Sequence, residues 1–139
     1  MNGNSFLLDT NISLGCVKGD ETALGFVGER SDSALYVSVI TRMELLAFSG
    51  LTSEQEEIIH NFLGDTSVVP LNADVERIAI ALRRETRRKL PDAIVAATAV
   101  WLGAPLATAD KKLSKTVFQG LRTIYVPMPS ADPSQEPVP

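Results

Sequence analysis

Four carboxylates lie where secondary structure is expected to begin or end, and they are the side chains best suited to chemistry. They are Asp9, Glu44, Asp92 and Asp110. Carboxylate oxygens are the ligands that Mg²⁺ and Mn²⁺ prefer, whereas softer ions bind Cys or His. The chain of 139 residues has one Cys and one His, which excludes a Cys/His metal cluster. The four acids therefore predict a divalent-cation site suited to reactions of phosphoryl groups.

Each acid also has a structural interpretation. Asp9 and Asp110 could each cap the helix that follows, so each has a capping role and a site role open to it. Glu44 could complete a capping box with Thr41, which is the better interpretation when Glu44 is taken alone. Asp92 could favour the positive end of a helix dipole. Apolar neighbours predict that Glu44 and Asp92 are partly buried.

These structural interpretations weaken when the four acids are considered together. Carboxylates gathered at one edge of a sheet repel one another strongly. Such a cluster persists mainly where a bound cation offsets the repulsion. The hypothesis of one shared cation site therefore depends on whether the fold brings the acids together.

The expected elements alternate between strand and helix along the chain. Short apolar runs predict strands at 6–9, 35–38, 67–70, 106–108 and 123–126. Helical spacing, capping residues and Pro91 predict helices between these strands, one of them capped by Thr41. This alternation predicts an α/β fold with a parallel sheet covered on both faces. Ligands of such sheets bind outside the carboxyl ends of the strands, where the four acids are expected to converge.

The charge distribution is informative although the net charge of −4 argues against a nucleic-acid partner. Eight of the 13 basic residues form two clusters: Arg83, Arg84, Arg87, Arg88 and Lys89, and then Lys111, Lys112 and Lys115. Each cluster adjoins one of the four acids. Alone, such clusters are solvated helix ends; beside a metal site, we expect Arg87, Arg88 or Lys111 to contact a phosphate backbone.

The remaining features define the limits of the domain. No apolar run approaches the roughly 20 residues of a membrane span. The first residues lack the basic stretch of a signal peptide, so a cytoplasmic protein is expected. Residues 1–126 are predicted to form one domain, and 127–139 a proline-rich, disordered tail. Glycine-rich dinucleotide and P-loop motifs are absent.

Four segments together resemble a known family. The segments 6–11, 41–45, 89–99 and 106–111 look like the successive signatures of PIN-domain ribonucleases. The likeness is greatest to the VapC-type toxins of bacterial toxin–antitoxin pairs, and it covers about residues 5–126. Its strongest part is Leu-Pro-Asp-Ala-Ile-Val-Ala-Ala at 90–97.

The resemblance implies a three-layer α/β/α fold with a mostly parallel sheet of four to five strands. It implies an endoribonuclease that requires Mg²⁺ or Mn²⁺, forms a homodimer and binds a cognate antitoxin protein. By position, Asp9, Asp92 and Asp110 would hold the metal, and Glu44 would bind metal or orient the attacking water. Thr10 and Thr108 match the polar residues that accompany these acids in the family.

Two alternatives remain open from the sequence. Many family members carry a further acid at the position of Lys112, so a PIN fold with weakened catalysis that serves as a binding module is one alternative. A receiver-like phosphoacceptor domain is the other. That domain requires an acid after its third strand, where this chain has Pro70, Leu71 and Asn72.

Overall fold

The computed structural model describes residues 4–129, in which five parallel strands form one sheet in the order β3-β2-β1-β4-β5. The strands are β1 (Ser5–Leu8), β2 (Ala34–Ser38), β3 (Ser67–Val69), β4 (Leu106–Thr108) and β5 (Thr123–Tyr125). The predicted α/β fold with a sheet of four to five strands is confirmed, and every strand pairing found is parallel.

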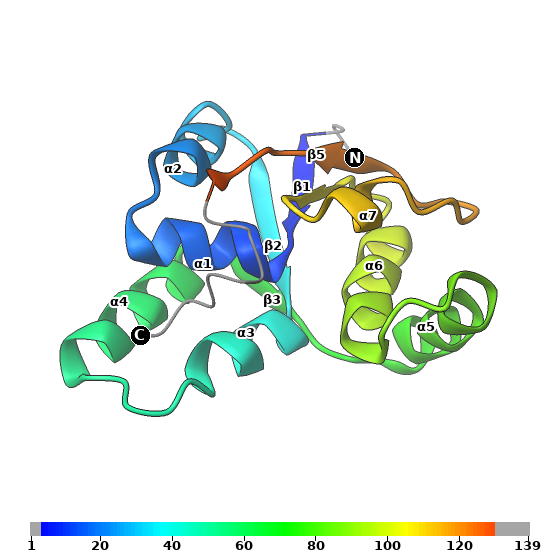
Figure 1. The fold of residues 1–139 in the computed structure, drawn as a ribbon, viewed down its shortest axis with the longest axis horizontal. Coiled ribbons are helices and arrows are strands. Elements are labelled where there is room, and N and C mark those ends of the chain that lie inside the picture. Colours follow the sequence, from blue (N-terminus) through cyan, green and yellow to red (C-terminus); the bar gives the residue numbers. More distant parts are fainter. Residues whose placement is uncertain (1–3, 130–139) are drawn as a thin grey trace.

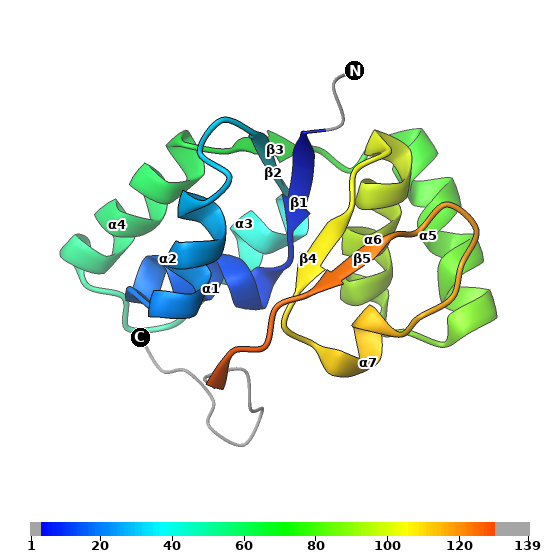
Figure 2. The ribbon, with the colours of Figure 1, turned by 90° about the horizontal axis from the view of Figure 1, so that it is seen from above.

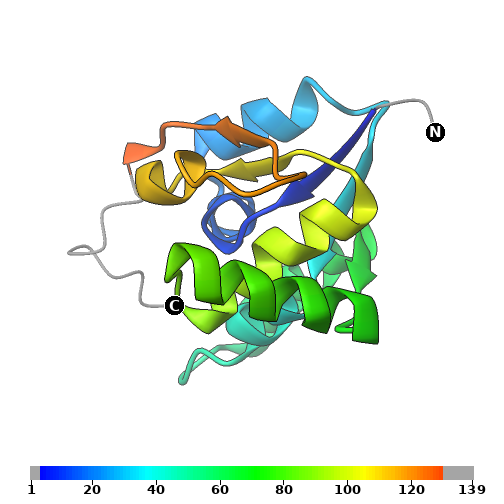
Figure 3. The ribbon, with the colours of Figure 1, turned by 90° about the vertical axis from the view of Figure 1, so that its right-hand side faces the viewer.

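Helices cover both faces of this sheet. They are α1 (Thr10–Lys18), α2 (Glu21–Gly28), α3 (Val39–Leu46), α4 (Ser53–Gly64), α5 (Ala73–Thr86), α6 (Leu90–Leu102) and the short α7 (Lys111–Ser114). Helices α1, α2 and α4 lie on one side of the sheet, and α5 and α6 on the other (Figures 1 and 2). Helix α5 packs along α6 (Figure 3), and α3 contacts both α1 and α6. Helix α3 therefore joins the two helical layers.

The strands are short apolar runs because both faces of the sheet are buried. Leu7 and Leu8 are fully buried, yet successive side chains of a strand point to opposite faces. Leu8 joins a core cluster that includes Val37 and Ala107. Leu7 joins a second cluster that includes Leu106 and one side of α6. Burying such a leucine stabilises the fold by about 1.5–3 kcal/mol.

Most helix ends follow the sequence signals, but the start of α3 does not. Asn72 caps α5, Pro91 lies in the first turn of α6, and Gly103 ends α6 in the left-handed conformation. Helix α3 begins at Val39, directly after β2, and Ser38 is its N-cap. The prediction that Thr41 caps this helix is therefore wrong, because the turn from strand to helix occurs three residues earlier.

The folded part of the chain extends beyond Val126. Met128 is 8% exposed and packs in the same cluster as Val126. Most of the segment predicted to be a disordered tail, residues 130–139, lies outside the described residues. Within residues 4–129, no helix has the length and hydrophobicity needed to span a bilayer.

Candidate active site

All four predicted acids line one cavity of about 630 Å³ at the carboxyl ends of the strands. Asp9 follows β1, Asp110 follows β4 by two residues, Asp92 lies in the first turn of α6, and Glu44 lies on α3. We call this the acidic cavity; its lining residues are Asp9, Thr10, Asn11, Leu14, Glu44, Ala47, Phe48, Asp92 and Asp110. The fold therefore brings together acids that are up to about 100 residues apart in sequence.

Asp9 is the most buried of these acids, at 6% exposure. It is the N-cap of α1, and one carboxylate oxygen, Oδ1, accepts a hydrogen bond from the Thr10 N–H at 2.8 Å. The capping role and the place in the cavity are thus compatible. Burial raises the pKa of Asp9 to about 6, the hydrogen bonds from Thr108 and Thr10 oppose this, and the nearby charges of Asp92 and Asp110 add to it.

Thr108 connects two of the acids. Its hydroxyl donates to Oδ2 of Asp9 at 2.6 Å and accepts a hydrogen bond from the Asp110 N–H at 3.0 Å. Thr108 is fully buried at the end of β4, so water does not compete for these bonds. One buried hydroxyl thereby fixes the spacing between the end of β1 and the turn after β4.

Thr10 fixes the position of Glu44 in a similar way, through a hydroxyl hydrogen bond. The Thr10 hydroxyl donates to Oε1 of Glu44 at 2.6 Å and lies 2.9 Å from the Thr41 hydroxyl. Since the single hydroxyl hydrogen of Thr10 goes to the carboxylate, Thr41 must donate to Thr10. Glu44 is exposed and bonds to Thr10. Both its predicted partial burial and its predicted capping box with Thr41 are therefore wrong.

Asp92 is half-buried, as its apolar neighbours predict. Its pKa is raised, first by burial and then by the charge of Asp110, with a smaller contribution from Glu44. Arg88 and Lys89 act in the opposite direction. Burial is thus the main cause of the raised pKa, and the neighbouring carboxylates add to it across the cavity.

Asp110 also caps a helix. Its Oδ1 accepts hydrogen bonds from the N–H groups of Lys112 and Leu113 at 2.9 and 3.1 Å, at the start of α7. Asn11, which lines the same cavity, accepts a hydrogen bond from the Ala109 N–H at 3.1 Å. The turn after β4 is therefore tied both to α1 and to its own short helix.

The donor set of the acidic cavity fits a hard divalent cation. Its charged groups are all carboxylates, and two of them have raised pKa values that a cation would lower. Within residues 4–129, however, no three Asp, Glu, His or Cys side chains are already arranged to hold a metal ion. A cation would have to draw these carboxylates together.

A second cavity, of about 800 Å³, adjoins the first and shares Asn11, Asp92 and Asp110 with it. We call it the basic cavity. Its other lining residues are Arg87, Arg88, Lys89, Ala109, Lys111, Lys112, Tyr125, Met128 and Pro129. The structure thus places all three predicted backbone-contacting cations, Arg87, Arg88 and Lys111, next to the acids.

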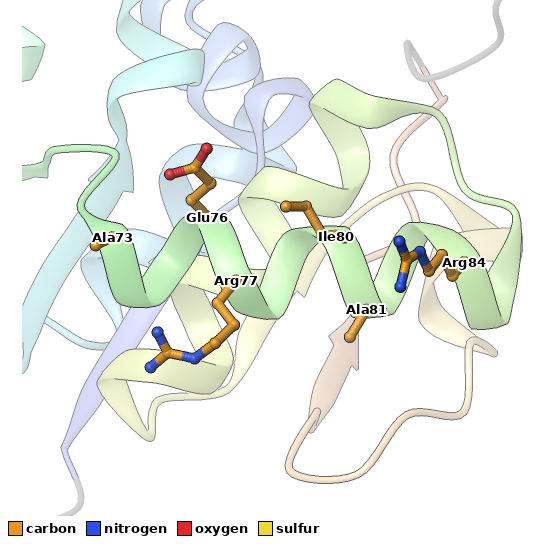
Figure 4. A pocket seen from close by; sticks show the side chains of 6 residues that line it. All are labelled: Ala73, Glu76, Arg77, Ile80, Ala81 and Arg84. Carbon is orange, nitrogen blue, oxygen red and sulfur yellow. The ribbon is translucent and has the colours of Figure 1, made fainter.

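A third hollow, of about 360 Å³, lies apart from these two along α5. Figure 4 shows its side chains, all of which come from that one helix: Ala73, Glu76, Arg77, Ile80, Ala81 and Arg84. It contains none of the four acids. The predicted cluster of basic residues at 83–89 is therefore divided, because Arg84 faces this hollow and Arg87 to Lys89 face the basic cavity.

Two residues at the site have no signal in the sequence that places them there. Thr41 lies behind the acidic cavity, where its hydroxyl meets that of Thr10, and nothing in its spacing indicates a contact with a residue 31 positions away. Tyr125 lines the basic cavity, but the sequence predicts only that it belongs to a strand. Its register opposite Thr108 in the sheet brings it to the basic cavity, and register between distant strands has no local signal.

Comparison with protein families gives a match over most of the folded chain. A family model described as PIN domain matches residues 6–119. Comparison with curated proteins gives no significant match.

Comparison with solved structures gives matches to chains of toxin–antitoxin and VapBC complexes. A toxin–antitoxin complex from Klebsiella pneumoniae contains a chain 30% identical to this one, with a TM-score of 0.72, covering 83% of this chain and 93% of that chain. DNA-bound VapBC from Salmonella typhimurium has 21% identity and a TM-score of 0.75, covering 87% and 97%. VapBC2 from Rickettsia felis, bound to a promoter DNA fragment, has 17% identity and a TM-score of 0.74, covering 87% and 98%.

Proposed function

This chain belongs to the PIN-domain family, and on that premise we propose that it is an endoribonuclease that requires Mg²⁺ or Mn²⁺. Its reaction would be hydrolysis of RNA phosphodiester bonds. The family is generally one of nucleases that use a divalent metal. The observation that carries the proposal for this chain is the convergence of Asp9, Glu44, Asp92 and Asp110 on one cavity.

Asp9, Asp92 and Asp110 are the residues that would hold the metal. When bound, the cation would supply a Lewis acid that stabilises negative charge on a phosphoryl oxygen. Glu44 keeps its second oxygen, Oε2, available because Thr10 engages Oε1. That oxygen would bind the metal or accept a hydrogen bond from the attacking water and so orient it. Thr10 and Thr108 would hold Glu44 and Asp9 in place.

The substrate backbone would enter along the basic cavity. Arg87, Arg88 and Lys111 would neutralise its phosphates, and the acids shared by both cavities would lie beside the cleaved bond. Net negative charge on the whole protein is compatible with this role, because the cations are concentrated at the cavity.

The biological role that we propose is the toxin of a toxin–antitoxin pair. Support comes from the solved complex of that kind at 30% identity and from the VapBC complexes that share the fold. A cognate antitoxin protein would then be a partner, a homodimer would be the active form, and the cytoplasm would be the place of action.

A second candidate is a PIN fold with weakened catalysis that serves as a binding module. Lys112 favours it, because this exposed cation lies two residues after Asp110 and lines the basic cavity. An ammonium group there would compete with a second metal for the carboxylates. The two candidates differ in turnover and share the RNA-binding surface.

A cleavage assay separates them. Purified protein is incubated with labelled single-stranded RNA while Mg²⁺ or Mn²⁺ is titrated, and Asp92→Asn is compared with Glu57→Gln. Glu57 is an exposed acid on α4 outside both cavities, so its variant controls for loss of one negative charge. We expect metal-dependent cleavage by the wild type and by Glu57→Gln, and none by Asp92→Asn.

Metal-independent cleavage, or full activity of Asp92→Asn, would overturn the nuclease proposal. RNA binding by the wild type without any cleavage would favour the binding module. Circular dichroism of each variant is the control for retention of the fold.

A further inference from the structure

The five cations of the basic cavity form no salt bridge with any acid in the described part of the chain. The salt bridges found in residues 4–129 are Arg30–Glu29 and Arg77–Asp74, and neither involves this cavity. The charges of Arg88 and Lys89 lower the pKa of Asp92, but neither cation forms a salt bridge with it in that part of the chain. The five cations outnumber Asp92 and Asp110, the two acids that line the same cavity, so a net positive charge remains that favours binding of an anion.

Arg87 adopts a backbone conformation that favours glycine. It follows the last residue of α5 with φ 61° and ψ 20°, and within residues 4–129 it is the one non-glycine residue with positive φ. Helices commonly end with glycine at such a position, because a side chain there costs free energy. An arginine in its place is explained if its guanidinium is needed in the basic cavity, which it lines.

Tyr125 presents an aromatic ring to the same cavity. It is the last residue of β5, an edge strand, and is paired with Thr108, whose hydroxyl binds Asp9. Tyr125 is 44% exposed, and its hydroxyl has no hydrogen-bond partner among the described residues. Two other aromatic rings, those of Phe6 and Phe26, lie near a cation, but the guanidinium of Arg30 already covers both. The Tyr125 ring is available to a ligand.

We propose that the basic cavity is a subsite for one unpaired nucleotide that flanks the cleaved phosphate, with the Tyr125 ring stacked on its base. Arg87 and Lys111 would hold the phosphate of that nucleotide. An aromatic platform beside a track of cations is how proteins bind single-stranded nucleic acid, since every base has a face to stack and a duplex hides it. The volume of about 800 Å³ lies in the range of pockets that hold small molecules. This inference rests on the proposed function for the identity of the ligand as RNA.

The test measures binding in EDTA, so that cleavage does not interfere. Fluorescence anisotropy of a short labelled single-stranded RNA is compared with that of a duplex of the same sequence. The variants are Tyr125→Ala, Tyr125→Phe and Arg87→Gly. Trp101→Ala is the matched control for the ring, because Trp101 is 43% exposed but lies roughly 14 Å along α6 from Asp92. Arg84→Ala, on the hollow of Figure 4, is the control for charge.

We expect Tyr125→Ala to weaken binding of the single strand by about tenfold. Tyr125→Phe keeps the ring and should keep the affinity. Arg87→Gly should weaken binding while leaving the melting temperature unchanged or higher, because glycine fits the left-handed conformation. A merely structural role of Arg87 would not separate affinity from stability in this way. Trp101→Ala should weaken binding less than Tyr125→Ala does, and Arg84→Ala less than Arg87→Gly does.

Several results would overturn the subsite. These are unchanged affinity of Tyr125→Ala, equal losses for Tyr125→Phe and Tyr125→Ala, unchanged affinity of Arg87→Gly, or a duplex that binds as tightly as the single strand. A parallel Mg²⁺ cleavage assay separates the two proposals. Cleavage by the wild type with binding indifferent to Tyr125 refutes the subsite alone, and Tyr125-dependent binding without cleavage refutes the nuclease alone.

Discussion

The acidic and the basic cavity share three residues but differ in how their charged groups are held. In the acidic cavity, Asp9, Glu44 and Asp110 each accept hydrogen bonds from the protein, and two threonine hydroxyls fix their positions. In the basic cavity, none of the cations forms a salt bridge within residues 4–129. Three of the four acids are thus tied to the protein before any ligand arrives, although a cation would still have to draw the carboxylates together. The cations, by contrast, would gain their partners from the ligand.

This difference assigns separate tasks to two halves of one surface. Held carboxylates give a site for chemistry, because a reaction requires fixed geometry. Long, unpaired cations give attraction and adaptability, because they neutralise phosphates without a fixed arrangement. Changes on the acidic side should therefore alter turnover, and changes on the basic side should alter affinity and its dependence on salt.

The largest effect is expected for Asp9→Asn. Loss of one metal-binding carboxylate should lower the cleavage rate by about 10³-fold or more, because charge stabilisation by a metal is worth several kcal/mol. Asparagine still caps α1, so the fold should persist. Single-turnover cleavage in saturating Mg²⁺ provides the measurement, with Glu57→Gln as the control. A rate within a few-fold of the wild type would remove Asp9 from the site.

The next effect concerns stability and pH in EDTA. The pKa of Asp9 is about 6 in the folded protein, above its ordinary value of 3.8, so the folded state binds this proton more tightly than the unfolded state. Its contribution to the free energy of unfolding therefore falls as pH rises from about 4 to about 6, by an amount of the order of 3 kcal/mol, and then levels off.

Urea unfolding at a series of pH values tests this. Asp9→Asn does not titrate, so its stability relative to the wild type should increase across that window. If the difference in free energy of unfolding between Asp9→Asn and the wild type does not change with pH, burial does not disfavour the charged Asp9 carboxylate. Added Mg²⁺ should stabilise the wild type at neutral pH, where the carboxylate is charged.

A smaller loss is expected for Thr108→Val. The variant removes the hydroxyl that binds Asp9 and accepts from the Asp110 N–H, while it keeps the shape of the side chain. Removal of such a supporting group should lower activity or metal affinity by about tenfold. Cleavage rates measured over a range of Mg²⁺ concentrations would detect either change. Thr98→Val is a suitable control, since Thr98 is buried in α6 and its hydroxyl donates to the Ile94 carbonyl of the same helix. Equal effects of the two variants would point to general destabilisation.

The smallest effect is expected on the basic side. Lys111→Ala should weaken RNA binding a few-fold and reduce the slope of log affinity against log salt concentration by about 0.7. The cleavage rate at saturating RNA should stay the same. Binding measured in EDTA at several salt concentrations gives the slope. If Lys111→Ala lowers the cleavage rate at saturating RNA and leaves the salt dependence of binding unchanged, Lys111 acts in turnover and not in affinity, which contradicts the assignment.

Much of this arrangement could be predicted from the sequence, for local reasons. Short apolar runs, Pro91 and Gly103 define where elements begin and end, and parallel strands bring their carboxyl ends to one edge. That reasoning, together with the four segments, identifies a PIN domain, and the family match over residues 6–119 confirms it. The roles of the individual acids, and the metal, stay predictions.

The remaining features depend on contacts between distant segments. The chain of hydroxyls from Thr41 through Thr10 to Glu44 joins α3 to α1, and no local pattern encodes it. The pairing of Tyr125 with Thr108 depends on strand register. The N-cap of α3 at Ser38 escapes prediction for another reason, because Thr41 and Glu44 fit the pattern of a capping box. In the structure both side chains bond to Thr10 instead.

The central claim is that the four carboxylates form one cation site. Titration with Mn²⁺, followed by electron paramagnetic resonance and displaced by Mg²⁺, tests it without RNA. We predict binding by the wild type and by Glu57→Gln, and binding at least about tenfold weaker by Asp92→Asn. Equal Mn²⁺ affinity of the wild type and Asp92→Asn would contradict the claim.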